Sequence, residues 1–505
     1  MNIMMLLEMA TQGFGDRVAF TQGTDQITYH ELFAAAGQAA ATVKQSGCAH
    51  LAMLDVSSLA MPIALFASGW AAVPFVPLNY RLTKVEINAL LNRIKPSYLV
   101  TDPDKLDTVQ DQSEGVIESR RKFIKAVCAQ PEKIPLNAID PWPMEQDDVA
   151  VLLFTSGTTG APKAAVLRQK HLVSYILSSV EFASAAEADA ALVCVPPYHI
   201  AGIAAVLSSV FAGRRVVQLA NFTAEAWLEL ARKERITHAF LVPTMLARVV
   251  DALAGHGSAN MPHLRAISYG GGKMPLSVVE RAMQLFPQTD FTNAYGLTET
   301  SSTIAVLGPQ DHRDVAASQD EQIKRRLISV GKPLPGVEIE IHDEEGNRLP
   351  AGQRGEIVVR GEQIAGEYKE QGSLKDHQGW FNTRDAGYMD DEGFLFLEGR
   401  IDDVIVRGGE NISPGEIEDV LLSHDAVADV AVVGIPDEQW GEGVAAAVVL
   451  NEGKLVDASE LQALVKMRLR SSRVPQTVQF LKELPYNDMG KLLRRVVRAE
   501  LSAVV

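Results

Sequence analysis

Cysteine is scarce in this chain of 505 residues. The three cysteines, Cys48, Cys128 and Cys194, are widely spaced, and none belongs to a Cys-x-x-Cys pair. An odd number at such spacing fits neither a disulfide framework nor a zinc site, so a reducing compartment is the simplest interpretation. Residues 1–17 also lack the basic start and long apolar core of a signal peptide, and Glu8 comes early. We therefore expect a cytoplasmic protein.

Basic residues are outnumbered by acidic ones. The 47 Lys and Arg stand against 63 Asp and Glu, which gives a formal charge of −16. This balance excludes a basic nucleic-acid binder, and 47% hydrophobic residues exclude a disordered tail. At about 150 residues per domain, the chain is long enough for several domains with cores of their own. The local positive excess in residues 455–505 is either a site for a polyanionic ligand or a solvated helix face.

Residues 59–78 carry no charge over a length that could cross a bilayer. Gly69, Pro74 and Pro77 interrupt the second half of this stretch, and proline breaks a helix. We therefore predict a short buried helix followed by a short buried extended segment at about residues 73–76, instead of a membrane span.

Helix and strand signals alternate through the first 330 residues. Capping boxes at Thr28 with Glu31 and at Thr83 with Glu86 begin two helices, and residues 98–100 form an apolar strand after the second. Further buried strands are expected at residues 192–195 and 216–219. The alternation predicts an α/β fold in which helices cover the sheets.

The pattern changes after residue 330. Residues 337–341 alternate strictly between apolar and charged, and glycine-rich turns separate the segments that follow, which predicts a β-rich subdomain at about residues 330–400. After Arg400, strand and helix signals form a unit of about a hundred residues. We predict a large N-terminal domain at 1–400 and a small, mobile α+β domain at 401–505.

Residues 152–163 are the most specific segment, because an apolar strand leads there into hydroxyls, glycines and a lysine. Glycine lets backbone N–H groups approach an anion, and hydroxyls and Lys163 contact phosphate oxygens. The common nucleotide loop has a longer gap between its glycines and a Ser or Thr after its lysine, where this chain has Ala164. A plain turn would not need so many ordered positions. The candidate phosphate-binding residues are Thr155, Ser156, Gly157, Thr158, Thr159 and Lys163.

Five separated motifs in this order resemble the adenylate-forming superfamily, which includes acyl-CoA synthetases, luciferases and the adenylation domains of peptide synthetases. The similarity extends from Asp16 to Lys491. The motifs are TSGTTGAPK at 155–163, YGLTET at 295–300, GWFNTRD at 379–385, GRIDD at 399–403 and NDMGK at 487–491.

The resemblance implies that a carboxylate is joined to the α-phosphate of ATP, that pyrophosphate is released and that the acyl group passes from AMP to a thiol. ATP, Mg²⁺ and CoA are thus the expected cofactors and acceptor. Because two anions must meet, the site must neutralise charge. In the family, the loop at 155–163 holds the β- and γ-phosphates, and a glutamate at the position of Glu299, next to Thr298, ligates Mg²⁺ and acts in catalysis.

The resemblance also implies a nucleoside site. Tyr295 would stack on adenine, the two oxygens of Asp385 would accept hydrogen bonds from both ribose hydroxyls, and Arg400 would reach the ribose or a phosphate. Arg384 departs from the family, which commonly has glycine before this aspartate. The remaining expected adenine contacts are at Asn293, Ala294 and Gly296.

Residues after 400 supply the expected moving parts. Lys491 resembles the catalytic lysine that bridges the carboxylate and the α-phosphate, which lowers the repulsion between them. Asp402 falls where the family has its hinge, about which the small domain rotates between adenylation and thioester formation. Gly408 and Gly409 either border the channel for the thiol or form only a tight bend.

The acyl pocket is expected between residues 197–202, whose His199 resembles a gating residue, and Gly270, Gly271 and Gly272, which resemble the pocket wall. Three glycines leave room that side chains would fill, so an apolar and bulky acid, alicyclic or aryl, is expected. A core histidine whose hydrogen bonds are satisfied is the alternative for His199.

Three functional hypotheses follow. The first is an ATP-dependent acid–CoA ligase. The second is an adenylate-forming enzyme that passes the acyl group to a separate carrier protein or partner enzyme. The third, a non-catalytic nucleotide-binding regulator, would be expected to lose Lys491 or Glu299, and both are present.

Overall fold

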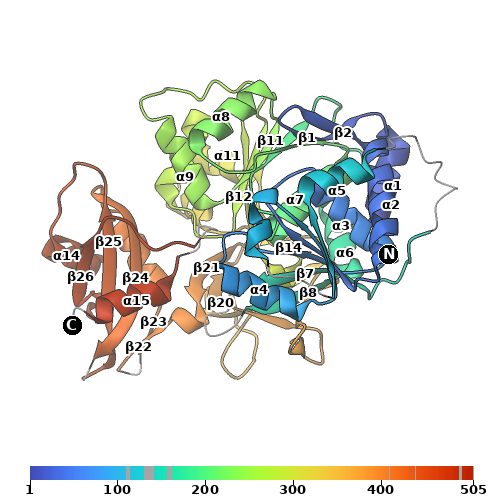
Figure 1. The fold of residues 1–505 in the computed structure, drawn as a ribbon. Coiled ribbons are helices and arrows are strands. Elements are labelled where there is room, and N and C mark those ends of the chain that lie inside the picture. The colour runs from blue at the N-terminus through green and yellow to red at the C-terminus, as the bar shows by residue number, and fades with distance from the viewer. Residues whose placement is uncertain are drawn as a thin grey trace.

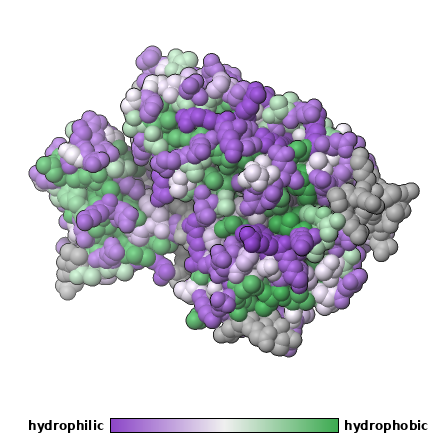
Figure 2. Space-filling model, turned by 45° about the horizontal axis from the view of Figure 1, so that its top comes forward, coloured by the Kyte–Doolittle hydropathy of each residue, from purple (hydrophilic) through white to green (hydrophobic). Residues whose placement is uncertain are grey.

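The computed structural model describes residues 1–109, 114–129, 141–155, 162–408, 410–437, 439–487 and 492–503. A large body contains the N-terminal four fifths of the chain, and a smaller lobe, drawn in orange and red in Figure 1, stands beside it. Figure 2 shows that hydrophilic residues cover much of the visible face of the body, with apolar patches between them.

A nine-stranded sheet runs through the body in the order β15-β14-β13-β12-β11-β9-β10-β1-β2. Neighbouring strands from β13 to β1 are parallel, so their carboxyl ends share one edge. The strands are β1 (Val18–Gln22), β2 (Asp25–Thr28), β9 (Ala190–Val193), β10 (Arg215–Gln218), β11 (His238–Leu241), β12 (Ala266–Gly270), β13 (Asp290–Leu297), β14 (Ser302–Leu307) and β15 (Lys332–Pro333).

A second, eight-stranded sheet has the order β19-β18-β8-β7-β4-β3-β5-β6, with its strands from β7 to β6 parallel. The strands are β3 (His50–Leu54), β4 (Phe75–Pro77), β5 (Ser97–Thr101), β6 (Val116–Ser119), β7 (Val149–Thr155), β8 (Lys163–Arg168), β18 (Glu367–Tyr368) and β19 (Gly372–Ser373).

Helices form three layers around these two sheets. The largest core packs α1, α2, α3, α6 and α7 between strands of both sheets, as with Phe20 of the first and Leu51 of the second. Helices α8 to α10 cover the outer face of the first sheet, and α4 covers that of the second. The helices are α1 (Met4–Phe14), α2 (Tyr29–Ser46), α3 (Ala60–Ala71), α4 (Lys84–Arg93), α5 (Arg120–Val127), α6 (Gln169–Ser179), α7 (Ile200–Ala212), α8 (Ala224–Lys233), α9 (Pro243–Ala252), α10 (Leu276–Leu285), α11 (Pro309–Ala317) and α12 (Glu321–Arg325).

A four-stranded antiparallel sheet follows, in the order β16-β17-β20-β21. It comprises β16 (Val337–His342), β17 (Gly355–Gly361), β20 (Phe381–Met389) and β21 (Leu395–Arg400), and it packs on the first sheet through a shared apolar core. The predicted β-rich segment is therefore present, with its end strand leading directly into the smaller lobe.

The smaller lobe is a five-stranded sheet with helices on both faces. Val432 of β24 packs toward α13 and α14, and the neighbouring Val433 packs toward α15, as the alternation of a strand requires. Ser413 Oγ donates to the Glu398 carbonyl at 2.7 Å and joins the lobe to the end of β21. The elements are β22 (Ile405–Arg407), β23 (Glu410–Ile412), α13 (Pro414–Leu422), β24 (Val427–Asp437), β25 (Gly441–Leu450), α14 (Ala458–Arg468), β26 (Thr477–Leu481) and α15 (Arg494–Ser502).

The local predictions are confirmed. Both capping boxes form, at the starts of α2 and α4. The uncharged stretch at 59–78 is the fully buried α3 followed by the short strand β4. In the part of the chain that the structure describes, no helix is both long and apolar enough to cross a membrane. The fold is the expected α/β arrangement of helix-covered sheets with a C-terminal α+β lobe.

Candidate active site

The carboxyl edge of the first sheet gathers segments that are far apart in the sequence. His199 follows β9, Gly270 ends β12, and β13 ends at Leu297 just before Glu299. Gly270 pairs with Ala294 on the neighbouring strand. Because ligands of open α/β sheets bind outside the carboxyl ends of parallel strands, this edge is where a site is expected.

Asp385 joins the first sheet to the β-rich sheet. The Tyr295 hydroxyl donates to Asp385 Oδ2 at 2.6 Å, and Arg400 Nη1 donates to Asp385 Oδ1 at 2.9 Å and to the Thr383 carbonyl at 2.8 Å. The aspartate is only 8% exposed, so these partners stabilise a charge that would otherwise be costly to bury. Burial, reinforced by Asp385, raises the pKa of Tyr295, which stays a neutral donor. Three predicted nucleoside residues thus form one hydrogen-bonded unit.

Glu299 is fixed through both its backbone and its side chain. It lies in the 3₁₀ turn η3 (Thr298–Thr300), and its carbonyl accepts hydrogen bonds from the N–H groups of Ala365 and Gly366, each at 2.9 Å. Its carboxylate accepts a hydrogen bond from the Tyr368 hydroxyl. Sequence reasoning missed Tyr368, because nothing in its local pattern indicates which distant strand it will join.

The predicted phosphate loop begins and ends in a β-hairpin. Thr155 at the end of β7 pairs with Lys163 at the start of β8, and the Lys163 ammonium lies 5.5 Å from the centre of the Tyr368 ring. Four of the predicted phosphate-binding residues lie outside the described residues, namely Ser156, Gly157, Thr158 and Thr159. Gly409 of the predicted thiol channel and the predicted catalytic Lys491 also lie outside them.

Arg93 braces the base of this hairpin, which the sequence did not reveal. Its Nη1 donates to the Pro162 carbonyl at 2.5 Å, its guanidinium pairs with Glu370, and its Cζ lies 4.8 Å from the centre of the Phe154 ring. Glu370 also accepts from the N–H of Ala164 at 3.3 Å. Contacts to two backbone groups, at Pro162 and Ala164, fix where the chain re-enters the sheet at the start of β8.

His199 is a buried side chain at the N-cap of α7. Its Nε2 has no hydrogen-bond partner among the described residues, and burial lowers its pKa to about 4. The imidazole is therefore neutral near pH 7. An unpartnered ring nitrogen does not fit the alternative of a fully hydrogen-bonded core histidine.

The three glycines after β12 differ in what they require. A Cβ on Gly270 would stand 2.1 Å from the Ala294 carbonyl oxygen, so close strand packing, not pocket space, excludes a side chain there. Gly271 has φ +84°, which favours glycine. A Cβ on Gly272 would meet only Pro243, at 3.6 Å. The prediction that glycine leaves room for the acid therefore fits Gly272, whereas at Gly270 the neighbouring strand leaves no such room.

The expected hinge residue Asp402 lies in the turn η5 (Ile401–Asp403), between the two lobes. Arg384 donates to both of its carboxylate oxygens, at 2.6 and 3.2 Å. The backbone of Arg384 has φ +61°, which explains why glycine suits this position in the family. Gly408 has φ +59° and a Cβ there would lie 2.7 Å from the Trp440 ring, so its bend is structurally required.

A buried ion pair lies at the carboxyl edge of the second sheet. Asp55 follows β3, its side chain is fully buried, and Arg120 Nη1 lies 2.6 Å from it. Arg120 also reaches Asp102, which follows β5. Burial raises the pKa of Asp55 to about 7, against the opposing effect of Arg120.

Replacing Asp55 with asparagine should remove a pH-dependent part of the stability. The ordinary pKa is 3.8, so the folded protein holds an extra proton between that pH and about 7. The extra proton on Asp55 therefore adds to the free energy of unfolding. This contribution is fully present below pH 4 and is lost as the pH rises to 7. Chemical denaturation should find that the wild-type protein loses about 4 kcal/mol relative to D55N between these pH values. A constant difference would contradict this assignment.

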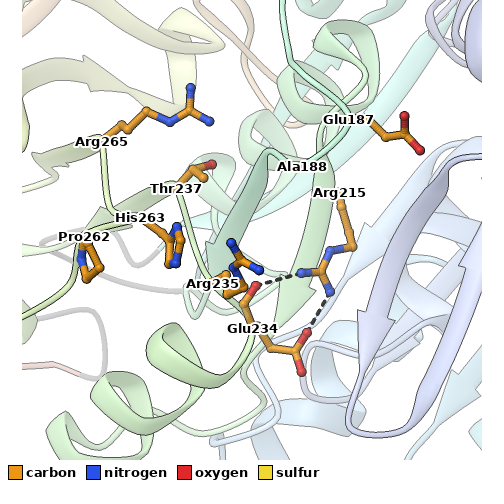
Figure 3. A pocket seen from close by; sticks show the side chains of 9 residues that line it. All are labelled: Glu187, Ala188, Arg215, Glu234, Arg235, Thr237, Pro262, His263 and Arg265. Carbon is orange, nitrogen blue, oxygen red and sulfur yellow. Dashed lines mark hydrogen bonds and ion pairs between the residues drawn. The ribbon is translucent and has the colours of Figure 1, made fainter.

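A different hollow, of about 380 Å³, lies at the opposite edge of the first sheet. Figure 3 shows Arg215 there, bonded to Glu234, with His263 and Arg265 nearby. The residues that line it lie at or just before the amino ends of β9, β10, β11 and β12, so this hollow is separate from the predicted site.

Oxygen ligands at Glu299 fit the expected Mg²⁺. This ion is usually held by one or two carboxylates together with substrate phosphates, and not by a cage of protein ligands. Among the described residues no group of three or more His, Cys, Asp or Glu could hold a metal. A single carboxylate, fixed next to the hairpin of the phosphate loop, is the donor set that a phosphate-bound Mg²⁺ requires.

Comparisons with known proteins agree with this geometry. The family model "AMP-binding enzyme" matches residues 7–369, and "AMP-binding enzyme C-terminal domain" matches residues 416–491. The chain is 34% identical to the 2-succinylbenzoate–CoA ligase of Bacillus licheniformis, covering 95% of this chain and 96% of the relative. It is 31% identical to feruloyl-CoA synthase from an Amycolatopsis species, covering 95% of each.

Among solved structures, the o-succinylbenzoate CoA synthetase of Bacillus subtilis matches with a TM-score of 0.81 and 30% identity in its complex with an acyl-adenylate, covering 98% of this chain and 97% of that one. The same enzyme with ATP and magnesium matches with a TM-score of 0.80, covering 97% and 98%. The chain therefore belongs to the AMP-binding enzyme family, and its resemblance to the adenylate-forming, acyl-CoA synthetase-like enzymes is confirmed.

Proposed function

We propose that this protein is an AMP-forming acid–thiol ligase that activates a carboxylic acid with ATP and transfers the acyl group to CoA. The observation that carries the proposal is the unit of Tyr295, Asp385 and Arg400 beside the fixed Glu299, because four groups from three motifs meet at one sheet edge. The relatives that are CoA ligases over almost their whole length support CoA as the acceptor.

The nucleoside half of the site follows from this unit. The Asp385 carboxylate accepts from the ribose hydroxyls, and Arg400, which still has N–H groups to donate, contacts the ribose or the α-phosphate. Tyr295 provides a flat surface for adenine, with the backbone of Asn293, Ala294 and Gly296 alongside. Asn293 is held by a bond from its Nδ2 to the Ser329 carbonyl at 3.0 Å, which fixes this strand end.

The phosphate half of the site is formed at the hairpin of β7 and β8 in the second sheet. Lys163 and the loop from Thr155 hold the β- and γ-phosphates, and Glu299 with Thr298 holds the metal. Bound Mg²⁺ would neutralise phosphate charge and so ease attack by a carboxylate. The protein's own part is to hold the two anions in line, since the acid is already ionised at neutral pH.

The C-terminal lobe supplies the remaining charge. We propose a large domain at 1–400 and a mobile domain at 401–505, which turns about Asp402. In one pose Lys491 bridges the carboxylate and the α-phosphate, and in the other Gly408 and Gly409 border the channel for the thiol. Arg384 restrains Asp402 from the large-domain side of this hinge.

The acid is proposed to be apolar and bulky, of the aryl or alicyclic class. His199 and the edge at Gly270–Gly272 form the pocket, and the two curated relatives act on aryl acids by name. The cysteines are unpaired, and the cytoplasm is the proposed location.

The test is to incubate the protein with ATP, Mg²⁺, CoA and a panel of short, fatty, aryl and polycyclic acids, and to measure acyl-AMP and acyl-CoA separately by mass spectrometry. Acyl-CoA formation from an aryl or alicyclic acid supports the proposal. Acyl-AMP without acyl-CoA would favour a carrier protein or partner enzyme as acceptor, and neither product from any acid would contradict the proposed ligase.

Gly272 offers a test of the pocket. Replacement by valine should leave folding intact, because the nearest atom to a Cβ there is 3.6 Å away, yet it should narrow the space for the acid. We expect kcat/KM for the best bulky acid to fall at least about 10-fold relative to that for a short acid. Gly270→Ala is the contrasting variant, because its clash with the Ala294 carbonyl should lower thermal stability. An equal loss with all acids in G272V would contradict the pocket assignment.

A further inference from the structure

Tyr368 is the residue at which the parts of the phosphate half meet. It lies on the two-residue strand β18, pairs with Ala165 of β8 and donates its hydroxyl to the Glu299 carboxylate. Thr155 Oγ1, at the other end of the hairpin, donates to the Lys163 carbonyl at 3.4 Å. The Lys163 ammonium lies over its ring, with 5.5 Å between the nitrogen and the ring centre. The lysine at the end of the phosphate hairpin and the proposed metal-binding carboxylate thus contact one side chain.

We propose that Tyr368 is a positioning residue. Its hydroxyl orients Glu299 for Mg²⁺, and its ring restrains the Lys163 ammonium near that carboxylate. The inference deepens the proposed function, on which it rests. No sequence motif identified above includes Tyr368, and the reaction as described does not use it.

The hydroxyl acts on the carboxylate. It donates to Oε1 of Glu299, while Oε2 accepts no hydrogen bond from any other described residue, so the bond fixes the rotation of the carboxylate and leaves an oxygen for the metal. Burial and the Glu299 charge raise the pKa of Tyr368, which keeps its proton at neutral pH. A hydrogen bond to a metal-binding carboxylate commonly changes metal affinity or activity by about 10- to 100-fold when it is removed.

The ring acts on the lysine. A cation over an aromatic face is attracted to the ring's electron density, which restrains an otherwise flexible ammonium. The segment that carries the ring is itself held by backbone hydrogen bonds. The N–H groups of Ala365 and Gly366 donate to the Glu299 carbonyl, and the N–H of Lys369 donates to the Ala164 carbonyl at 2.9 Å. The ring therefore has fixed positions relative to both Glu299 and β8.

Two substitutions separate these effects. Tyr368→Phe removes the hydroxyl and keeps the ring, whereas Tyr368→Leu removes both. For Y368F we expect the Mg²⁺ concentration at half-maximal pyrophosphate exchange to rise about 10-fold, with the KM for ATP at saturating Mg²⁺ changed less than about 2-fold. For Y368L the KM for ATP should rise as well. Tyr388→Phe is the matched control, since it loses a hydroxyl bonded to Arg325 at 2.7 Å on a strand of the β-rich sheet.

The second readout does not depend on turnover. Mn²⁺ is titrated into the full-length protein with a non-hydrolysable ATP analogue and no acid, and free Mn²⁺ is measured by electron paramagnetic resonance. Weaker Mn²⁺ binding in Y368F, about 10-fold, with wild-type binding in Y388F supports the inference. Wild-type Mn²⁺ affinity in a folded Y368F, or equal weakening in both variants, overturns it. Failure of the ligase proposal is seen separately, as absent product in the wild-type protein with any acid.

Discussion

Asp385→Ala should lower acid-dependent pyrophosphate exchange by at least about 100-fold, the size of effect expected when a group that positions the nucleotide is lost. The carboxylate is the proposed acceptor for both ribose hydroxyls. The variant also leaves the Tyr295 hydroxyl and Arg400 without their shared partner, at a cost of about 1–3 kcal/mol in stability. Exchange and thermal unfolding should therefore be measured on the same preparation.

Two further variants separate the two effects. Asp385→Asn keeps the side-chain volume and one acceptor oxygen, so this variant should fold. Calorimetric titration should nevertheless find that it binds AMP more weakly than the wild-type protein does. Asp391→Ala removes an exposed aspartate a short distance along the chain and should change neither activity nor stability. A folded D385A with wild-type exchange would show that Asp385 only joins the two sheets.

Lys491→Ala should cut the adenylation rate by about 100- to 1,000-fold and leave the affinity for ATP within about 3-fold of the wild-type value. The reason is electrostatic: the ammonium is proposed to contact the carboxylate and the α-phosphate together, and this contact strengthens as charge develops in the transition state. Rapid-quench measurement of acyl-AMP formation and calorimetric titration with ATP give the two numbers.

The same variant also tests the rotation of the lobe. When chemically prepared acyl-AMP and CoA are supplied, K491A should form acyl-CoA at close to the wild-type rate, because the lysine is expected to leave the site for this step. Lys482→Ala removes an exposed lysine of the same lobe and is the control for a general charge effect. An unchanged adenylation rate in K491A would refute the role given to this lysine.

Local chemistry was predictable from the sequence wherever the partners lie close along the chain. Thr28 and Glu31, or Thr83 and Glu86, are three residues apart, so their capping boxes could be expected before any fold was known. The same holds for the proline-interrupted stretch at 59–78. The expected site residues Tyr295, Asp385 and Arg400 came from motifs, and the structure brings them into one unit.

Contacts between distant segments could not be predicted in the same way. Tyr368 and Arg93 carry no motif, and their partners are 69 and 277 residues away in Glu299 and Glu370. Asp55 gains a buried partner only because β3 and β6 belong to one sheet. The argument that glycine at position 270 leaves empty space failed for a related reason, since only the strand pairing reveals that the Ala294 carbonyl occupies the place of a Cβ there.

Exchange of labelled pyrophosphate into ATP, measured without CoA, tests the central claim most directly. The account predicts exchange that requires both Mg²⁺ and a carboxylic acid, is fastest with a bulky apolar acid and is lost in D385A and K491A. The account would be contradicted if the folded wild-type protein catalysed exchange with none of the acids. It would also be contradicted if D385A and K491A catalysed exchange as fast as the wild-type protein.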